Sequence, residues 1–213
     1  AYGEVVLAAI GRVPNTDADW FRSSGLKLDE RGYVTVDGYG RTNLDGVWAL
    51  GDITPGHALA HRAFEQGITI AEKIAGADPK PVIDDTVPQV VFSFPEAASV
   101  GLTLDQAKAR EDVVEPKETA YPMLSNARML MSGEGGSMTV VSGAFANNPD
   151  MQVVLGVHIV SPIASDLIAE AEQLVGNRVP LADAARLIHP HPTFSETLGE
   201  ALLKADGRPL HTR

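Results

Sequence analysis

The sequence contains no cysteine, and this absence excludes several classes of protein. Disulfide-stapled domains, thiolate zinc sites and cysteine nucleophiles cannot exist within these 213 residues. A redox-active dithiol within the chain is excluded for the same reason. Any sulfur chemistry in which this chain takes part must therefore use sulfur atoms from elsewhere.

Basic residues are also scarce, with 17 Lys and Arg against 28 Asp and Glu and a formal net charge of -11. Such a charge repels phosphate backbones, so we predict no nucleic-acid binding. No uncharged apolar run approaches the ~18 residues that span a bilayer, and residues 1–4 lack the basic and apolar regions of a signal peptide. We therefore expect a soluble, cytoplasmic protein without a membrane segment.

The remaining composition is that of a folded protein, with 44% hydrophobic residues. In residues 1–83, the continuous apolar run Glu4–Ile10 predicts a buried strand, and apolar residues at helical spacing predict a helix over Ala58–Ala75. Short strands are predicted over Tyr33–Val36 and Val47–Leu50. Because a buried strand needs neighbours and none precede this one, we interpret residues 1–83 as an incomplete α/β domain and expect the chain to be part of a longer protein.

Residues 84–213 follow a linker rich in Pro and Asp, and they predict an α+β domain with an antiparallel sheet. The predicted strands cover Val90–Phe94, Ser99–Leu102, Ser137–Ala144 and Val153–Val160, with a turn at residues 147–150. The predicted helices cover Thr103–Arg110, Ser165–Arg178, Pro180–Leu187 and Ser195–Ala205. Thr103 and Gln106 have the spacing of a capping box.

The segment HPHPTFSE, residues 189–196, is the strongest candidate for chemistry. Two imidazoles lie in a loop that proline stiffens, and a carboxylate follows at the start of a predicted helix. A carboxylate that accepts a hydrogen bond from one ring nitrogen makes the other nitrogen a proton acceptor near neutral pH. The residue types therefore allow a catalytic pair of His191 and Glu196, although the pattern alone favours the capping box described next.

Two other interpretations of this segment stay open. Thr193 and Glu196 have the spacing of a capping box, in which the carboxylate serves only backbone N–H groups. The two imidazoles could also combine with His57 and His61, which are spaced one helical turn apart, in a metal site. Because no set of carboxylate ligands accompanies these histidines, we predict no metal site.

Candidates outside this segment are weaker. Asp52 follows the predicted strand Val47–Leu50, where an open α/β sheet would hold a ligand hydroxyl, although a turn carboxylate is the alternative. His158 lies in an apolar strand and is interpreted as a packed core residue, and His211 is expected in a mobile tail. The run Gly133–Gly136 is no dinucleotide fingerprint, and the sequence has no nucleophile elbow.

Five motifs follow one another along the chain: AAIGRVPNT at Ala8–Thr16, TNLDGVWALGD at Thr42–Asp52, LAHRA at Leu59–Ala63, PEAASVGLT at Pro95–Thr103 and HPHPTFSE. Together they resemble the carboxyl-terminal portion of the dihydrolipoamide dehydrogenases, a family of flavoprotein disulfide reductases. In order, they are similar to the last strand of the NAD domain, the second flavin motif, the segment beneath the flavin, the opening of the interface domain and the catalytic sequence.

The resemblance implies roles for individual residues near a flavin. Asp52 would bind a ribityl hydroxyl of FAD. Leu59, Ala60 and His61 would lie along the pyrimidine edge of the flavin.

The resemblance also implies a catalytic role for the second half of the chain. His191 would be the acid–base residue, Glu196 would orient it, and the bond between His191 and Pro192 would be cis. This assignment favours the catalytic pair over the capping box, and a carboxylate at a helix start could serve both purposes at different times.

The implied fold is a dimerisation (interface) domain at 84–213, preceded at 1–83 by the remaining part of an α/β FAD/NAD-binding domain. The implied reaction is the oxidation of dihydrolipoamide and reduction of NAD, by way of a redox disulfide and FAD. The implied partners are a second copy in a homodimer, whose site is shared between subunits, and the lipoyl domains of 2-oxo acid dehydrogenase complexes.

Departures from the family set limits on what the chain does alone. These residues lack the redox cysteines and the main phosphate-binding loop for FAD, so we expect the isolated chain to be inactive and to bind no FAD. The alternatives are another flavoprotein disulfide reductase (mycothione, glutathione, mercuric or quinone reductase) and a non-catalytic dimerisation module.

Overall fold

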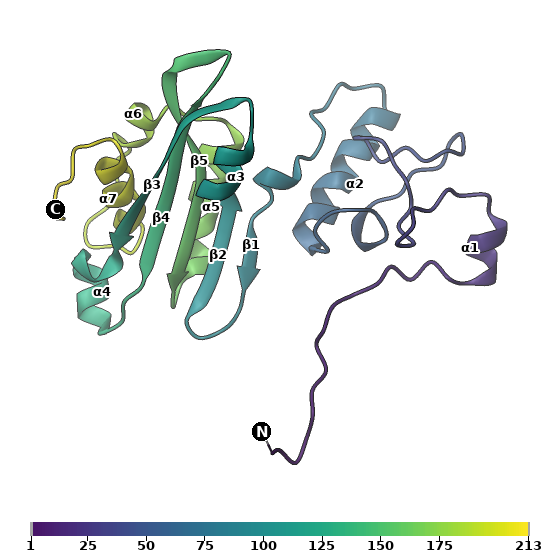
Figure 1. Ribbon diagram of the computed structural model, residues 1–213, viewed down its shortest axis with the longest axis horizontal. Helices are drawn as coiled ribbons and strands as arrows, with labels where there is room; N and C mark the ends of the chain where they lie inside the picture. Colours follow the sequence, from purple (N-terminus) through teal and green to yellow (C-terminus); the bar gives the residue numbers. More distant parts are fainter. Residues whose placement is uncertain (1, 213) are drawn as a thin grey trace. The chain divides into compact units, whose positions relative to one another are not determined.

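The computed structural model describes residues 2–212, and the chain forms two compact units that divide after Asp84 (Figure 1). The first unit contains the helices α1 (Asp19–Ser23) and α2 (Ala60–Ile74) and the 3-10 turn η1 (Gly51–Ile53). Its small core consists of Phe21, Val34 and Ala49. The predicted helix at Ala58–Ala75 is thus confirmed as α2, with slightly shorter ends.

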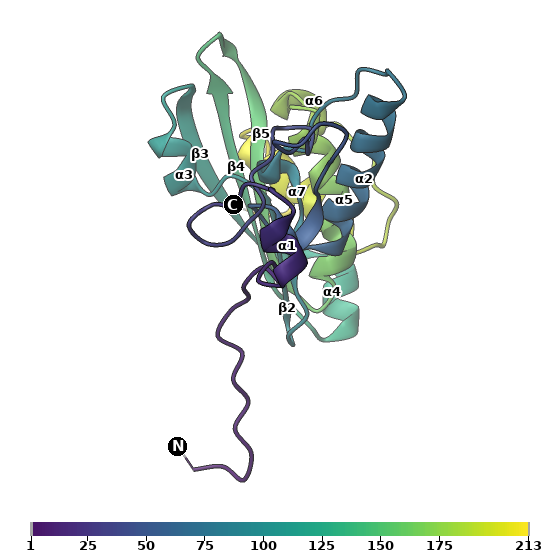
Figure 2. The ribbon, with the colours of Figure 1, turned by 90° about the vertical axis from the view of Figure 1, so that its right-hand side faces the viewer.

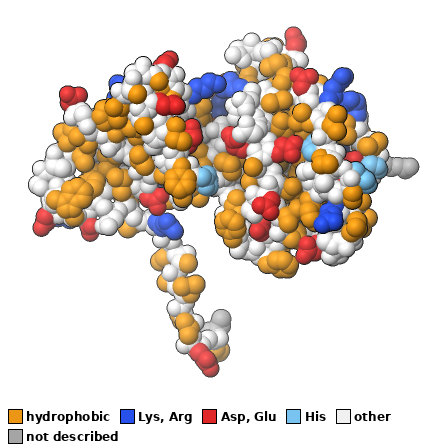
Figure 3. Space-filling view, turned by 180° about the vertical axis from the view of Figure 1, so that it is seen from behind, with side chains coloured by type: hydrophobic (Ala, Val, Ile, Leu, Met, Phe, Trp, Pro, Cys, Tyr) orange, Lys and Arg blue, Asp and Glu red, His pale blue; other side chains and the backbone are white. Residues whose placement is uncertain are grey.

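The strand predicted over Glu4–Ile10 is wrong for this structure. The segment is extended, but it pairs with no described residue, and Val5, Val6 and Ile10 are 87%, 91% and 97% exposed. Figure 1 shows the extended course of the segment, and Figure 3 shows hydrophobic side chains along it. An apolar run becomes a strand only when neighbouring backbone satisfies its N–H and C=O groups.

The strands predicted over Tyr33–Val36 and Val47–Leu50 are also wrong, because each is reduced to a single bridge residue. Local turns compete for the backbone in this region. The Asp29 carboxylate accepts the backbone N–H of Tyr33, and the Asp37 carboxylate accepts that of Arg41, each at 2.9 Å. Aspartate side chains that bind backbone in this way favour turns over sheet ladders.

The second unit is built on a five-stranded antiparallel sheet of order β1-β2-β5-β4-β3. The strands are β1 (Gln89–Val91), β2 (Glu96–Gly101), β3 (Val113–Pro122), β4 (Ser137–Phe145) and β5 (Asn148–Ser161). The helices are α3 (Leu104–Ala109), α4 (Ala127–Ser132), α5 (Ala164–Gly176), α6 (Leu181–Ala184) and α7 (Glu196–Ala205). Two 3-10 turns, η2 (Asp84–Thr86) and η3 (Met123–Ser125), complete the elements. None of the described helices is long and apolar enough to cross a membrane.

Alternation along the central strands divides the core between the two faces of the sheet. Met138 and Val140 of β4 belong to the larger cluster, which includes residues of α5, α6 and α7. Val141 of β4 and Leu155 of β5 belong to a smaller cluster with Ala107 of α3. Figure 2 shows α5 and α7 on one side of the sheet and α3 on the other. The predicted α+β class with an antiparallel sheet is confirmed.

Several element predictions are confirmed with shifted ends, and others need correction. The capping box of Thr103 and Gln106 is present at the start of α3. The turn that joins β4 and β5 is present but lies at residues 146–147 instead of 147–150, because β4 runs to Phe145 and β5 begins at Asn148. The helix predicted at Pro180–Leu187 is shorter, at Leu181–Ala184.

Strand β3 and helix α4 were not predicted. β3 contains Pro116, Pro122 and several charged residues, which are depleted in strands. It lies at the edge of the sheet, where proline is tolerated because one side of the strand has no ladder to complete. The position in the sheet, which local sequence does not reveal, therefore decides that this segment is a strand.

Candidate active site

His191 and Glu196 form a hydrogen-bonded pair at the start of α7. The distance between His191 Nδ1 and Glu196 Oε1 is 2.8 Å. The His191 side chain is 70% exposed, whereas that of Glu196 is 21% exposed. The carboxylate is therefore largely enclosed, while most of the imidazole faces outward. The peptide bond between His191 and Pro192 is cis, as the resemblance implies.

The second oxygen of Glu196 binds the backbone of the same loop. Glu196 Oε2 accepts the N–H of Thr193 at 2.7 Å. The other half of the capping box, in which the Thr193 hydroxyl would accept the backbone N–H of Glu196, is missing. The Thr193 hydroxyl donates to the Pro190 carbonyl oxygen instead. The N-cap residue of α7 is Ser195, and its side chain makes no capping hydrogen bond. The two interpretations of Glu196 are thus combined, since one oxygen holds the backbone and the other holds the imidazole at the same time.

These contacts also settle the charge of the carboxylate. Burial raises the pKa of Glu196, but the hydrogen bonds from Thr193 and His191 oppose it, and the net result is a pKa below the ordinary value. An ionised carboxylate only accepts hydrogen bonds, so the proton in the pair lies on His191 Nδ1. His191 Nε2 then keeps its lone pair and can accept a proton, with the carboxylate stabilising the imidazolium that forms.

His189 supports the same loop from its inner side. Its side chain is only 9% exposed, and its Nε2 lies 2.8 Å from Oε1 of Glu170 on α5. The hydrogen bond with Glu170 raises the pKa of His189, against the opposing effect of burial. The ring also packs on Gly199 of α7, where a Cβ would lie 2.6 Å from His189 Nδ1. His189 therefore anchors the loop to two helices.

Because the pKa of His189 is raised, its contribution to stability depends on pH in a defined direction. The stabilisation is complete below the unfolded pKa near 6.5 and is lost as pH rises through the higher folded pKa. We expect Glu170→Gln to lower the free energy of unfolding of the second unit by about 1 kcal/mol at pH 6 and by less than half of that at pH 9. Urea denaturation at the two pH values measures this, and an equal or larger loss at pH 9 contradicts it.

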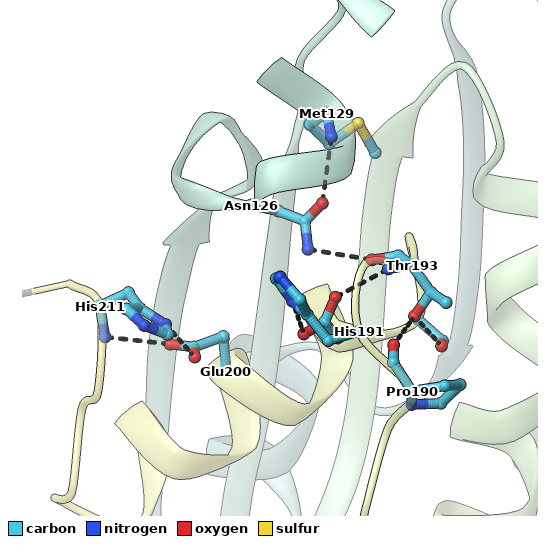
Figure 4. Close-up of polar contacts among 9 residues, drawn as sticks. Asn126, Met129, Pro190, His191, Thr193, Glu200 and His211 are labelled. Carbon is cyan, nitrogen blue, oxygen red and sulfur yellow. Dashed lines mark hydrogen bonds and ion pairs between the residues drawn. The ribbon is translucent and has the colours of Figure 1, made fainter. Parts of the chain in front are cut away.

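His211 is not in a mobile tail as predicted. Its Nδ1 lies 2.7 Å from Glu200 Oε1, and its backbone N–H donates to Glu200 Oε2 at 3.2 Å. The prediction failed because Glu200 is a buried carboxylate on α7 that the carboxyl-terminal segment covers. Glu196 and Glu200, which are four residues apart on α7, thus each bind a histidine that lies outside the helix. Figure 4 shows His211 against Glu200, with His191 nearby.

A buried tyrosine lies beside these two carboxylates. Burial, with the charges of Glu200 and Glu196, raises the pKa of Tyr121 to about 12. The hydroxyl is therefore neutral at physiological pH.

His158, predicted as a packed core residue, is half-buried, and its Nε2 lies 3.1 Å from the Leu102 carbonyl oxygen.

The residues implied to lie near a flavin are all in the first unit. Asp52 is exposed in η1, and its carboxylate lies 3.4 Å from the Arg12 guanidinium. The preceding Gly51 has a φ of +73° and donates its N–H to Gln66 of α2 at 2.9 Å. Asp52 is therefore carried on a turn that is hydrogen-bonded to α2.

Leu59, Ala60 and His61 lie at the amino-terminal end of the 15-residue helix α2, with Leu59 at the N-cap and no side-chain cap. The following residue, Arg62, is buried and structural, because its Nε donates to Asp84 Oδ1 at 2.6 Å and its Nη2 donates to the Pro55 carbonyl oxygen at 2.7 Å. Helix N-termini favour electronegative groups. A carboxylate that can accept a hydrogen bond from a hydroxyl, on a turn bound to α2, and a helix start without a side-chain cap fit a ligand rich in oxygen atoms such as FAD.

The metal interpretation finds no support in the part of the chain that the structure describes. No group of three or more His, Cys, Asp or Glu residues lies close enough there to hold a metal ion. His57 and His61 lie in the first unit, and the imidazoles of the candidate site lie in the second.

Two residues of the site were missed by sequence reasoning. Asn126 binds the loop, as shown below, and its only local signal is the preference of asparagine for helix N-caps. Glu170 has no local signal at all, because it is one of three acidic residues in α5 and acidic residues are ordinary in an amphipathic helix.

The fold and the site belong to a defined class of protein. The family model described as "Pyridine nucleotide-disulphide oxidoreductase, dimerisation domain" matches residues 87–202, and the one described as "Pyridine nucleotide-disulphide oxidoreductase" matches residues 2–67. The chain therefore belongs to the pyridine nucleotide-disulphide oxidoreductase family.

Within this family, the chain is similar to dihydrolipoyl dehydrogenases. That of Cupriavidus necator is 41% identical over 208 residues, which are 97% of this chain and 42% of the relative. That of Geobacillus stearothermophilus is 39% identical over 210 residues, which are 98% of this chain and 43% of the relative. The chain thus spans less than half the length of these curated relatives.

Solved structures show the same fold. LpdA from Mycobacterium tuberculosis superposes with a TM-score of 0.82 at 31% identity, over 92% of this chain and 42% of that chain. RclA, a flavoprotein disulfide reductase from Escherichia coli that is induced by HOCl, gives a TM-score of 0.77 at 23% identity, over 91% and 43% of the two chains. The second likeness shows the fold alone.

Proposed function

We propose that this chain is the carboxyl-terminal portion of an FAD-dependent dihydrolipoamide dehydrogenase and supplies its acid–base pair. The observation that carries the proposal is the His191–Glu196 pair, which has an enclosed, ionised carboxylate and an outward imidazole. The similarity to dihydrolipoyl dehydrogenases over nearly the whole chain supports it.

The chemistry of the pair suits the exchange between a dithiol and a disulfide. A thiolate, not a thiol, attacks a disulfide, and an ordinary thiol is mostly protonated at neutral pH. His191 Nε2 takes the thiol proton while Glu196 holds Nδ1 and stabilises the imidazolium. The thiolate then forms a bond to one sulfur of the disulfide, and the other sulfur leaves as a thiolate.

The electron carriers come from outside the acid–base pair. FAD and NAD, when bound to the longer protein, would receive the two electrons taken from the dithiol. In this proposal Asp52, Leu59, Ala60 and His61 hold FAD. The redox disulfide belongs to a part of the longer protein outside these residues, because the chain has no cysteine.

The partners follow from the same proposal. The match of residues 87–202 to a dimerisation domain supports a homodimer, in which His191 and Glu196 serve the flavin and disulfide of the partner subunit. The lipoyl domains of 2-oxo acid dehydrogenase complexes would carry the substrate. A cytoplasmic location belongs to this proposal as well.

The test is an assay of the longer protein with dihydrolipoamide and NAD. We expect NAD reduction and a bound FAD that is released on denaturation. Faster turnover of mycothione, glutathione, a mercuric salt or a quinone would assign another reductase, and loss of all these activities in a yellow, folded protein would contradict the proposal. The isolated 213-residue chain is the control, and it should be colourless and inactive.

A further inference from the structure

Asn126 makes two hydrogen bonds of different kinds and is 5% exposed. Its Oδ1 accepts the N–H of Met129 at 3.0 Å, which caps the start of α4. Its Nδ2 donates to the carbonyl oxygen of Thr193 at 3.1 Å, in the loop before α7 (Figure 4). Capping requires only the oxygen, so the amide nitrogen provides a separate connection between segments 67 residues apart.

Thr193 connects this contact to the catalytic pair. Its carbonyl oxygen accepts from Asn126, and its N–H donates to Glu196 Oε2 at 2.7 Å. The two groups lie on either side of the same Cα atom, so fixing the carbonyl restricts the direction of the N–H. All the backbone polar groups of Thr193 are therefore used to hold the loop in one conformation.

A second contact shows that the start of α4 packs on this loop. The Arg128 guanidinium carbon lies 5.5 Å from the centre of the Phe194 ring, within the range of a cation–π interaction. Neighbouring residues of α4 thus meet neighbouring residues of the loop. The contact made by Asn126 belongs to a packed surface.

We propose that Asn126 is a positioning residue, which holds the Thr193 carbonyl oxygen so that the Thr193 N–H stays directed at the carboxylate of Glu196. Through that carboxylate, Asn126 fixes the tautomer and orientation of His191. The catalytic meaning of this role rests on the function proposed above, but the hydrogen-bond chain itself does not.

Asn126→Asp separates the two contacts. A carboxylate still caps α4, because Asp and Asn are comparable N-cap residues, but it cannot donate to the Thr193 carbonyl. In the 213-residue chain, we expect the amide-exchange protection of Met129 to stay within threefold of wild type and that of Thr193 to fall at least tenfold. Ring ¹⁵N shifts of His191 should change from the Nδ1–H tautomer to a mixture.

Two further variants make the outcome decisive. Asn126→Ser also caps the helix, carries no charge and lacks the amide donor, so it replaces Asn126→Asp if that variant does not fold. Asn177→Asp is the matched control. Asn177 is exposed at the end of α5, so this substitution adds the same negative charge away from the loop. Unchanged protection of Thr193 in a folded Asn126 variant overturns the proposal.

An activity assay of the longer protein is a second, independent test of the role of Asn126. We expect Asn126→Ser to lower kcat for dihydrolipoamide about tenfold with KM within twofold, because a disordered acid–base pair slows proton transfer without removing substrate contacts. If the longer protein does not oxidise dihydrolipoamide, the proposed function fails, and the exchange experiment still decides the role of Asn126. A kcat within twofold of wild type overturns the catalytic part.

Discussion

Replacing His191 by glutamine should slow dihydrolipoamide oxidation by the longer protein about 10² to 10⁴-fold at pH 7, the usual range for loss of a general base. Glutamine keeps a polar side chain that can still reach Glu196, but it accepts no proton at this pH. The attacking thiol then ionises by itself, and only a few per cent of an ordinary thiol is thiolate at neutral pH. Rapid mixing of the oxidised protein with dihydrolipoamide measures the step directly.

The pH dependence of this variant separates a base from a merely structural residue. Above pH ~8.5 the thiol ionises without a base, so the fold decrease in rate caused by His191→Gln should become smaller. His211→Gln is the matched control, because His211 binds the other carboxylate of α7, Glu200, and its loss should leave the rate within threefold of wild type. A loss for His191→Gln that is the same at pH 7 and pH 9 would argue against proton transfer by this residue.

Gly156→Ala should destabilise the second unit by about 3 kcal/mol, near the upper end of the usual range for overpacking. Gly156 of β5 pairs with Gly101 of β2, just before the chain turns into α3. A Cβ at position 156 would lie 2.2 Å from the carbonyl oxygen of Leu102 and 2.8 Å from its nitrogen. These are backbone atoms, so no side-chain rotation relieves the clash and the strands must separate.

The control for this prediction is Gly133→Ala. Gly133 has a φ of +70° after α4 but no atom within 4 Å of a Cβ, so alanine should cost only the conformational strain of about 1 kcal/mol. Urea denaturation followed by far-ultraviolet circular dichroism measures both variants. Trp20 and Trp48, the two tryptophans of the chain, lie in the first unit, so their fluorescence should show an unchanged transition. Equal losses for the two variants would contradict the close-approach explanation.

Features with short sequence separation could be predicted from the sequence. The helices α2 and α5 follow from apolar residues at helical spacing, and the central strands follow from alternation. His191 and Glu196 are five residues apart, and the short loop between them, which begins with Pro192, leaves few ways to arrange their side chains. The geometry of this pair was therefore within reach of sequence reasoning, including the partial role of Glu196 in capping.

Features that depend on distant contacts could not be predicted. Glu4–Ile10 has the composition of a buried strand, but the described residues provide no neighbour for it. Asn126 reaches Thr193 from 67 residues away, and His211 is held by a carboxylate that is buried only when the chain folds over it. In each case the local sequence preference was read correctly, but tertiary contacts determined the structure that forms.

Because the two oxygens of Glu196 are each held by a different donor, this carboxylate has no reason to rotate when the imidazole gains or loses a proton. In the reaction proposed above, the ring would accept and release a proton in each turnover while its heavy atoms stay in place. The cost of arranging these dipoles is met once, during folding, and does not recur with each substrate.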